Sequence, residues 1–279
     1  MRWRVGFSFL VLLLVSSGIA TAELTIEGEI VDAKSGEPVP YVNVGVPAGG
    51  EGTVSDESGQ FSLTLSSADA PVLFTAVGYA AMTIPAARFP LGEPLALQPL
   101  ELSFQEQVKV TAKDPGPAEQ LGYRNDKPGY KMGFGSGMLG AELAARIKVS
   151  KPTYLESAHF TVARTGGERF LYRIHIYDLS TGEIGLDLLN KNVIVEAEQE
   201  VGTLSVDLRE LGLVVRDDVL LSLEWIRDDR EMGNANVMFR AKPRATGGVF
   251  LKGTSQMEFI KIPKHTLSFY LMGQRLSGR

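Results

Sequence analysis

The sequence contains no cysteine, which excludes disulfide bonds, thiol catalysis and zinc sites built on thiolates. A lipid anchor attached to a mature N-terminal cysteine is excluded for the same reason. Histidine is scarce, with three residues in 279, and none stands in the spacing of a zinc peptidase. A G-x-S-x-G nucleophile elbow is also missing. We therefore predict that the protein is not an enzyme and has no catalytic residues, metal or cofactor.

Long hydrophobic runs are confined to the start of the chain. Two arginines precede the apolar run 5–15, and residues 20–22 are small, an order that is typical of a secretory signal peptide. We predict that residues 1–22 are removed and that the mature protein starts at Glu23. No later run approaches the roughly 20 apolar residues that cross a bilayer. We expect a periplasmic or outer-membrane-associated protein without a transmembrane span, with an uncleaved N-terminal anchor as the alternative.

Helical periodicity is scarce, and short β-branched and aromatic runs separated by glycine, proline, aspartate and serine predict the all-β class. The strands expected in the first part of the chain are 25–31, 41–46, 59–65 and 72–77. Those expected in the second part are 158–164, 170–178, 193–196, 203–208, 219–226, 237–240 and 266–272. In the strand 219–226, Trp225 alternates with two leucines, so we expect it in the core.

Four stretches in the first part carry a family resemblance. They are GEIVD at 28–32, SGEPVPYVNV at 35–44, GTVSDESGQF at 52–61 and FTAVGY at 74–79. In order and spacing they resemble the carboxypeptidase-regulatory-like domain. The resemblance implies a seven-stranded, transthyretin-like β-sandwich over residues 23–110, without catalytic residues. Such domains are common in exported proteins of Bacteroidetes-type bacteria and at the N-termini of TonB-dependent outer-membrane transporters.

Residues 111–130 are rich in proline, glycine and charge, which predicts a linker. A second β-sandwich is expected over 131–279. Its stretches RIHIYD, DLLN, VDL and LEWI, which begin at residues 173, 187, 206 and 223, resemble a jelly-roll-like domain. That domain follows the regulatory-like module in the same exported proteins, and it implies architecture more than function.

The segment 135–140 spells G-x-G-x-x-G, the pattern of a dinucleotide-binding turn. That turn requires a preceding apolar strand and a surrounding βαβ unit. Residues 123–132 are polar and broken by proline, and the chain around them is a succession of strands. We interpret the segment as an entry loop of the second domain, followed by a short helix at 141–147.

One group of residues suggests ligand binding. In the strand 170–178 the even positions are the more apolar, which places Arg173, His175 and Tyr177 together on the opposite face. If this strand forms a hairpin with 158–164, matching of the apolar faces sets His159 opposite His175 and Thr161 opposite Arg173. The resulting polar-aromatic patch would suit a glycan or, less well, a metal held by the two histidines. An ordinary wet or covered sheet face is the alternative.

Charge is divided unevenly along the chain. Residues 23–110 hold 12 acidic and three basic residues, a net charge of −9, whereas 238–279 hold eight basic residues and one acidic. Either the two parts attract one another, or the basic end meets an anionic partner such as envelope lipid or polysaccharide. The net charge of −5 over the whole chain argues against nucleic acid.

We therefore expect an exported binding or assembly module of the cell envelope, with a cell-envelope protein or polysaccharide as its partner. The alternatives are a hydrolase with dispersed acidic residues and a structural accessory of an outer-membrane transport system.

Overall fold

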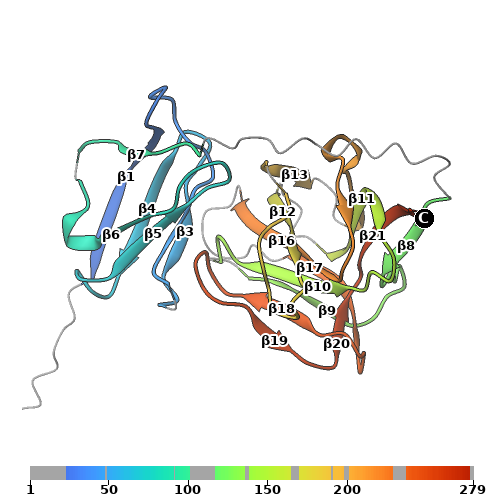
Figure 1. Cartoon of the computed structure of the whole chain (residues 1–279). Coiled ribbons are helices and arrows are strands. Elements are labelled where there is room, and N and C mark those ends of the chain that lie inside the picture. Colours follow the sequence, from blue (N-terminus) through green and yellow to red (C-terminus); the bar gives the residue numbers. More distant parts are fainter. Residues whose placement is uncertain are drawn as a thin grey trace, which may run out of the picture.

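The computed structural model shows an almost entirely β chain arranged as two sandwiches side by side (Figure 1). It describes residues 23–47, 49–90, 92–100, 117–135, 138–164, 170–189, 191–197, 201–228 and 237–276. The predicted signal peptide lies outside these residues. Among the described residues, no helix has the length and apolar character needed to cross a membrane.

The first sandwich contains seven strands and one short 3-10 helix, η1 (Ala86–Arg88). Its strands are β1 (Leu24–Asp32), β2 (Asn43–Gly45), β3 (Gly52–Val54), β4 (Gln60–Leu65), β5 (Pro71–Thr75), β6 (Met82–Pro85) and β7 (Leu95–Leu97). They form a three-stranded sheet in the order β4-β1-β7 and a four-stranded sheet in the order β3-β2-β5-β6. The inward side chains of both sheets build one apolar core, in which three phenylalanine rings pack against one another. The seven-stranded sandwich expected for this part is confirmed among the described residues.

The second sandwich comprises the remaining strands and the 3-10 helix η2 (Arg209–Leu211). Its strands are β8 (Glu119–Gly122), β9 (Lys131–Phe134), β10 (Glu142–Ile147), β11 (Thr153–Arg164), β12 (Phe170–Asp178), β13 (Val193–Ala197), β14 (Gly202–Asp207), β15 (Val214–Val215), β16 (Val219–Asp228), β17 (Val237–Pro243), β18 (Val249–Lys252), β19 (Ile260–Ile262), β20 (His265–Leu267) and β21 (Phe269–Arg275). One sheet runs β13-β12-β16-β10-β18-β19, and the other runs β20-β17-β11-β21-β8 with β14, β15 and β9 alongside. Their inner faces enclose a large apolar core that includes Trp225, as predicted.

The predicted hairpin between β11 and β12 is wrong. β12 pairs with β13 and β16 in the six-stranded sheet, whereas β11 pairs with β14, β15, β17 and β21 in the other sheet. His159 lies opposite Ser205 and Tyr270, and His175 lies opposite Ser222. Thr161 and Arg173 are therefore also in different sheets. The alternation of each strand was interpreted correctly, but the two inner faces meet across the core and not within one sheet.

Two local predictions also need correction. Residues 142–147 form strand β10 and not a helix, because Leu143, Ala145 and Ile147 enter the core with a period of two. Residues 119–122 lie in the expected linker but form β8, which pairs with β21.

The two sandwiches are in direct contact. The loop between β18 and β19 reaches the first sandwich, where Ser255 Oγ donates to the carbonyl oxygens of Val44 at 2.7 Å and Thr53 at 2.9 Å. A small apolar cluster at the same junction joins side chains of both sandwiches: Tyr41, Val54, Leu171, Ile194 and Ile226.

Candidate functional site

Arg173, His175 and Tyr177 share one face of β12, as the alternation predicted, but that face is covered. Their neighbours Tyr172 and Ile174 point into the main core. Arg173 is 2% exposed and His175 is 6% exposed. The hypothesis of an exposed polar-aromatic patch on this face is therefore wrong. A different arrangement, in which ionised groups are packed against one another, takes its place.

Four charged side chains cross the outer face of the six-stranded sheet in one row. Cross-strand pairing aligns Arg173 with Glu224, Glu224 with Glu142, and Glu142 with Lys252. The row therefore joins β12, β16, β10 and β18 with the charge order plus, minus, minus, plus. We call these four residues, together with His175, Asp187, Tyr177 and Ser222, the buried charge cluster.

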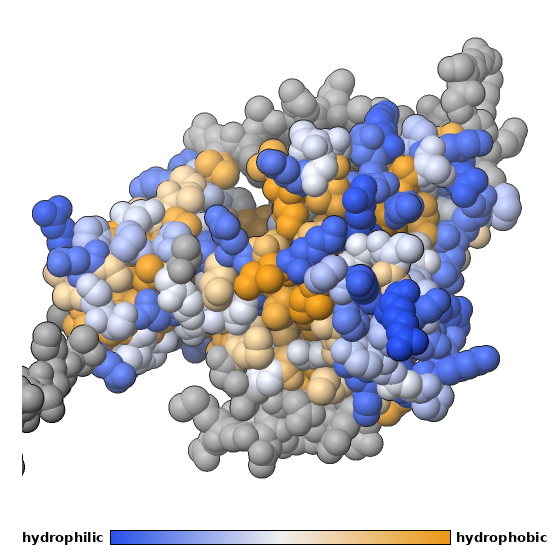
Figure 2. Space-filling view, turned by 90° about the horizontal axis from the view of Figure 1, so that it is seen from below, coloured by the Kyte–Doolittle hydropathy of each residue, from blue (hydrophilic) through white to orange (hydrophobic). Residues whose placement is uncertain are grey.

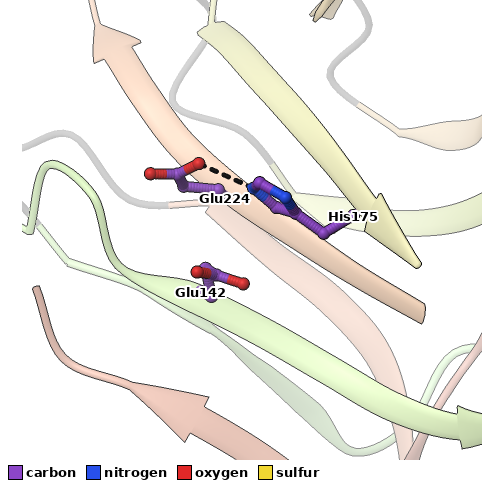
Figure 3. A group of neighbouring side chains, drawn as sticks. All are labelled: Glu142, His175 and Glu224. Carbon is purple, nitrogen blue, oxygen red and sulfur yellow. Dashed lines mark hydrogen bonds and ion pairs between the residues drawn. The ribbon is translucent and has the colours of Figure 1, made fainter. Parts of the chain in front are cut away.

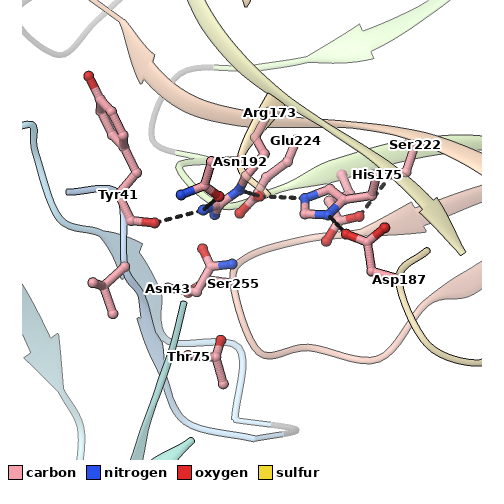
Figure 4. Close-up of polar contacts among 12 residues, drawn as sticks. Tyr41, Asn43, Thr75, Arg173, His175, Asp187, Asn192, Ser222, Glu224 and Ser255 are labelled. Atoms are coloured by element: carbon pink, nitrogen blue, oxygen red, sulfur yellow. Dashed lines mark hydrogen bonds and ion pairs between the residues drawn. The ribbon is translucent and has the colours of Figure 1, made fainter. Parts of the chain in front are cut away.

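His175 sits between two carboxylates. Its Nε2 lies 2.8 Å from Glu224 Oε2 (Figure 3), and its Nδ1 lies 2.7 Å from Asp187 Oδ2 (Figure 4). Burial alone would lower the pKa of His175, but the charge of Glu142 and the hydrogen bonds to Asp187 and Glu224 outweigh it and raise the pKa to about 9. The ring is therefore an imidazolium at neutral pH, with both nitrogens acting as donors.

Glu142 is the second carboxylate at the centre of the row and is 1% exposed. Lys252 Nζ donates to its Oε1 at 2.8 Å, while Ser222 Oγ at 2.8 Å and the Tyr177 hydroxyl at 3.0 Å donate to its Oε2. Burial lowers the pKa of Lys252, but the charge of Glu142 outweighs burial and leaves this pKa raised. Burial and the same carboxylate hold the pKa of Tyr177 well above its usual value. Tyr177 is therefore a neutral hydrogen-bond donor.

Arg173 connects the cluster to the first sandwich. Its Nε donates to Glu224 Oε2 at 2.7 Å, and its Nη1 donates to the backbone carbonyl of Tyr41 at 2.8 Å and to Asn192 Oδ1 at 3.3 Å (Figure 4). Burial would raise the pKa of Glu224, but Arg173 and then His175 outweigh it and lower this pKa. Glu224 is consequently ionised and is held by two cations.

The cluster meets the geometric requirement for a metal site but not the chemical one. Ligand atoms of Glu142, His175 and Glu224 lie within 4.8 Å of one another. Both nitrogens of His175 already face carboxylates, however, and a metal ligand must offer an unprotonated nitrogen. Glu224 Oε1 is buried and has no hydrogen-bond partner among the described residues, but Figure 3 shows this oxygen pointing away from the other two side chains. Arg173 and Lys252 would also repel a cation, so these residues do not fit a metal.

His159, the fourth predicted site residue, lies on the outer face of the other sheet. Its ring stacks on Tyr270 with centroids 4.6 Å apart, and its two nitrogens are 2.8 Å from the hydroxyls of Ser157 and Ser205. Burial and then the charge of Arg124 lower the pKa of His159. His159 and His175 therefore differ in charge at neutral pH and share no partner.

Sequence reasoning missed Glu142, Asp187, Glu224 and Lys252. Alternation around Trp225 already placed Glu224 on the face opposite the core, so the position of Glu224 could have been predicted from the sequence. Their convergence depends on the order of strands in the sheet, which alternation does not specify.

Comparisons with known proteins bear on the first sandwich. Residues 26–88 match the family model of the CarboxypepD_reg-like domain. No curated protein matches the chain. Solved structures of infectious bursal disease virus, Gx and Gt strains, are similar at 9% identity with TM-scores of 0.29 and 0.27. The alignments cover 91% and 92% of this chain but only 59% and 60% of the viral chains. Likeness at this level supports no argument about function.

Proposed function

We propose that the chain is an exported, non-enzymatic protein of the cell envelope, in which two β-sandwiches act together as a binding or assembly module. The observation that carries this proposal is the position of Arg173, which is buried and bonded both to Glu224 and to the backbone of Tyr41. A catalytic group must contact its substrate. Among the described residues, the buried ionisable groups Arg173, His175 and Glu224 instead contact one another, Asp187 and the neighbouring sandwich.

Charge balance within the cluster supports the same proposal. Three cations, Arg173, His175 and Lys252, face three carboxylates, those of Glu142, Asp187 and Glu224. A buried charge without a partner costs several kcal/mol, whereas a hydrogen-bonded set of opposite charges is tolerated. A set of charges balanced in this way suits a structural role better than the role of a general acid or base, which must exchange a proton with substrate.

The sequence supports the cellular compartment and the class of partner in this proposal. The signal-like segment 1–22 supports export, and the CarboxypepD_reg-like match supports an N-terminal module of a kind that is common in exported proteins. We retain the jelly-roll-like resemblance of residues 131–279 as part of the proposal. The partner is a protein or polysaccharide of the envelope, and not nucleic acid.

Fractionation of native cells, with sequencing of the mature N-terminus, tests export. We expect the protein in the envelope or periplasm with Glu23 as its first residue, and an intact Met1 in the cytoplasm would contradict the proposal. Purified mature protein should be inactive on panels of peptides and glycosides, with or without a chelator. A hydrolase activity that disappears in Glu224→Gln but persists in Glu156→Gln, at a half-buried glutamate of the other sheet, would replace the proposal with an enzymatic one.

A further inference from the structure

Basic residues gather at one end of the eight-stranded sheet. Five cations come from β9, from β17 and the turn after it, and from the turn between β19 and β20. We call them the basic patch: Lys131, Arg240, Lys242, Arg244 and Lys264. β20 lies at the lower edge of the second sandwich in Figure 1, and Figure 2 shows hydrophilic side chains gathered on this lower face, beside a hydrophobic group near the junction of the sandwiches.

Strand pairing brings like charges together within the patch. Lys131 and Arg240 are directly opposite one another in the antiparallel pair of β9 and β17. Phe239 and Ala241 point into the core, so Arg240 and Lys242 both point outward. Like charges directly opposite on adjacent strands destabilise a sheet. This arrangement therefore costs stability in the isolated chain.

Among the described residues, no carboxylate neutralises the patch. Some surface cations elsewhere are paired, such as Arg124 with Asp126, Arg209 with Asp207 and Arg275 with Glu119. None of the five patch cations forms an ion pair with a carboxylate of the described residues. Within the described residues, an ion pair between the sandwiches joins Glu57 to Arg227, which is not one of the patch cations. The positive charge of the patch is thus available to an external anion.

Two of the cations occupy positions that favour glycine. Arg244 has φ 58° and Lys264 has φ 59°, both in the left-handed region. Their turns are adjacent, since the backbone N–H of Ala245 donates to the carbonyl of Lys264 at 3.1 Å. Strained backbone that holds a side chain in place is typical of binding and catalytic sites.

Aromatic rings border the cations. Lys242 Nζ lies 5.6 Å from the centroid of the Tyr123 ring. Tyr130 is 46% exposed and stacks on His265 with centroids 5.3 Å apart. Tyrosine rings offer an apolar face together with a polar hydroxyl, which suits contact with a sugar. An anchor in a lipid surface would instead need a group of exposed aliphatic side chains. Among the described residues, the large exposed hydrophobic side chains on the elements that carry the patch are Tyr130 and, in β19, Ile260, and one aliphatic side chain does not make such a group.

We propose that the basic patch binds an acidic polysaccharide, with the cations pairing with carboxylate groups along the sugar chain and with Tyr123 and Tyr130 packing against sugar rings. This inference rests on the proposed binding function and gives it a ligand class and a site. The site is distinct from the buried charge cluster, which lies on the other sheet.

Affinity electrophoresis of mature protein in gels containing polygalacturonate tests the site, with neutral dextran as the reference polymer. We expect retardation by polygalacturonate that weakens as salt is added. The triple variant Lys131→Gln, Arg240→Gln, Lys242→Gln should bind about tenfold or more weakly, because three charge-assisted contacts are lost. A control triple variant, Lys148→Gln, Lys151→Gln, Arg216→Gln, has the same net charge and should bind like the wild-type protein. Fluorescence of Trp225 verifies that both variants are folded.

Three results would overturn the site. They are equal weakening in the two triple variants, no retardation of the wild-type protein, or binding to phosphatidylglycerol vesicles without binding to the polysaccharide. The substitution Tyr123→Ala should also weaken binding to polygalacturonate, without changing the salt dependence of that binding. If the protein is exported and binds envelope material through other residues, the proposed function is retained and the proposed binding site is wrong. If the protein is cytoplasmic, the proposed function is wrong whatever the result of the affinity electrophoresis.

Discussion

Arg173 and Tyr41 are 132 residues apart in the sequence, yet the guanidinium of Arg173 donates to the backbone carbonyl of Tyr41 across the junction of the two sandwiches. Tyr41 has φ 56°, a left-handed conformation at the end of the Pro38–Tyr41 segment. Its side chain is 9% exposed and packs with Ile226. The same guanidinium holds Glu224, so one side chain joins the buried charge cluster to the first sandwich.

Removal of Arg173 should be strongly destabilising. Arg173→Met leaves Glu224 buried with one of its two cations missing, and breaking a buried pair in this way costs about 3 to 5 kcal/mol. The double variant Arg173→Met, Glu224→Leu should recover much of the loss, because well-packed apolar replacements of buried ion pairs are often neutral. Urea unfolding followed by Trp225 fluorescence measures the free energy of unfolding of the single and the double variant.

Arg209→Met, which breaks an exposed pair, is the matched control and should have little effect on this free energy. Equal, small effects for Arg173→Met and Arg209→Met would contradict the structural role of the cluster.

Stability should fall at alkaline pH because of His175. The folded pKa of about 9 lies above the value near 6.5 of an unfolded histidine. The contribution of His175 is therefore fully present below about pH 6.5 and disappears as the pH rises through about 9. The difference amounts to about 3 kcal/mol. The unfolding free energy of the wild-type protein minus that of His175→Gln, measured from pH 6 to pH 10, should shrink along this course. A difference that is flat over this range would show that His175 is not held as an imidazolium.

The two sandwiches should unfold in a coupled manner. A Cβ atom on Gly52 of the first sandwich would lie 2.7 Å from Ser255 Oγ of the second, and Ser255 is fully buried. Gly52→Ala should therefore push Ser255 away from β3 and lower the free energy of unfolding by about 1 to 3 kcal/mol. Trp225 is the one tryptophan of residues 23–279 and reports on the second sandwich.

A shift of the Trp225 unfolding midpoint in Gly52→Ala would demonstrate coupling across the junction. Gly129→Ala is the control, because a Cβ atom there meets nothing within 4 Å. If the midpoint stays at the wild-type value while circular dichroism shows a less stable first sandwich, the sandwiches unfold independently.

Prediction from the sequence succeeded for features that depend on the alternation of apolar and polar residues within one strand. The strand 170–178 was predicted with the bounds of β12, and its two faces were assigned correctly. The hairpin failed because matching of apolar faces cannot distinguish neighbours within a sheet from strands that face one another across a core. β11 has 12 residues and pairs along its length with β14, β15, β17 and β21.

The buried charge cluster could be predicted only in part. Alternation places Arg173, His175 and Glu224 opposite the core, but it assigns that face to solvent by default. Burial of the face depends on the loop that carries Asp187, on the β18–β19 loop and on the first sandwich. These contacts join residues far apart in the sequence, such as Ser255 and Val44, and no local pattern encodes them.

We propose that the buried charge cluster stabilises the structure and takes no part in catalysis. A proton NMR titration of the His175 ring, assigned by comparison with His175→Gln, tests it most directly when it is run with and without Zn²⁺. We expect an inflection near pH 9 that Zn²⁺ does not change, because Asp187 and Glu224 hold both ring nitrogens as donors. An inflection near the ordinary histidine value of about 6.5, together with a Zn²⁺-dependent shift of the ring resonances, would contradict it.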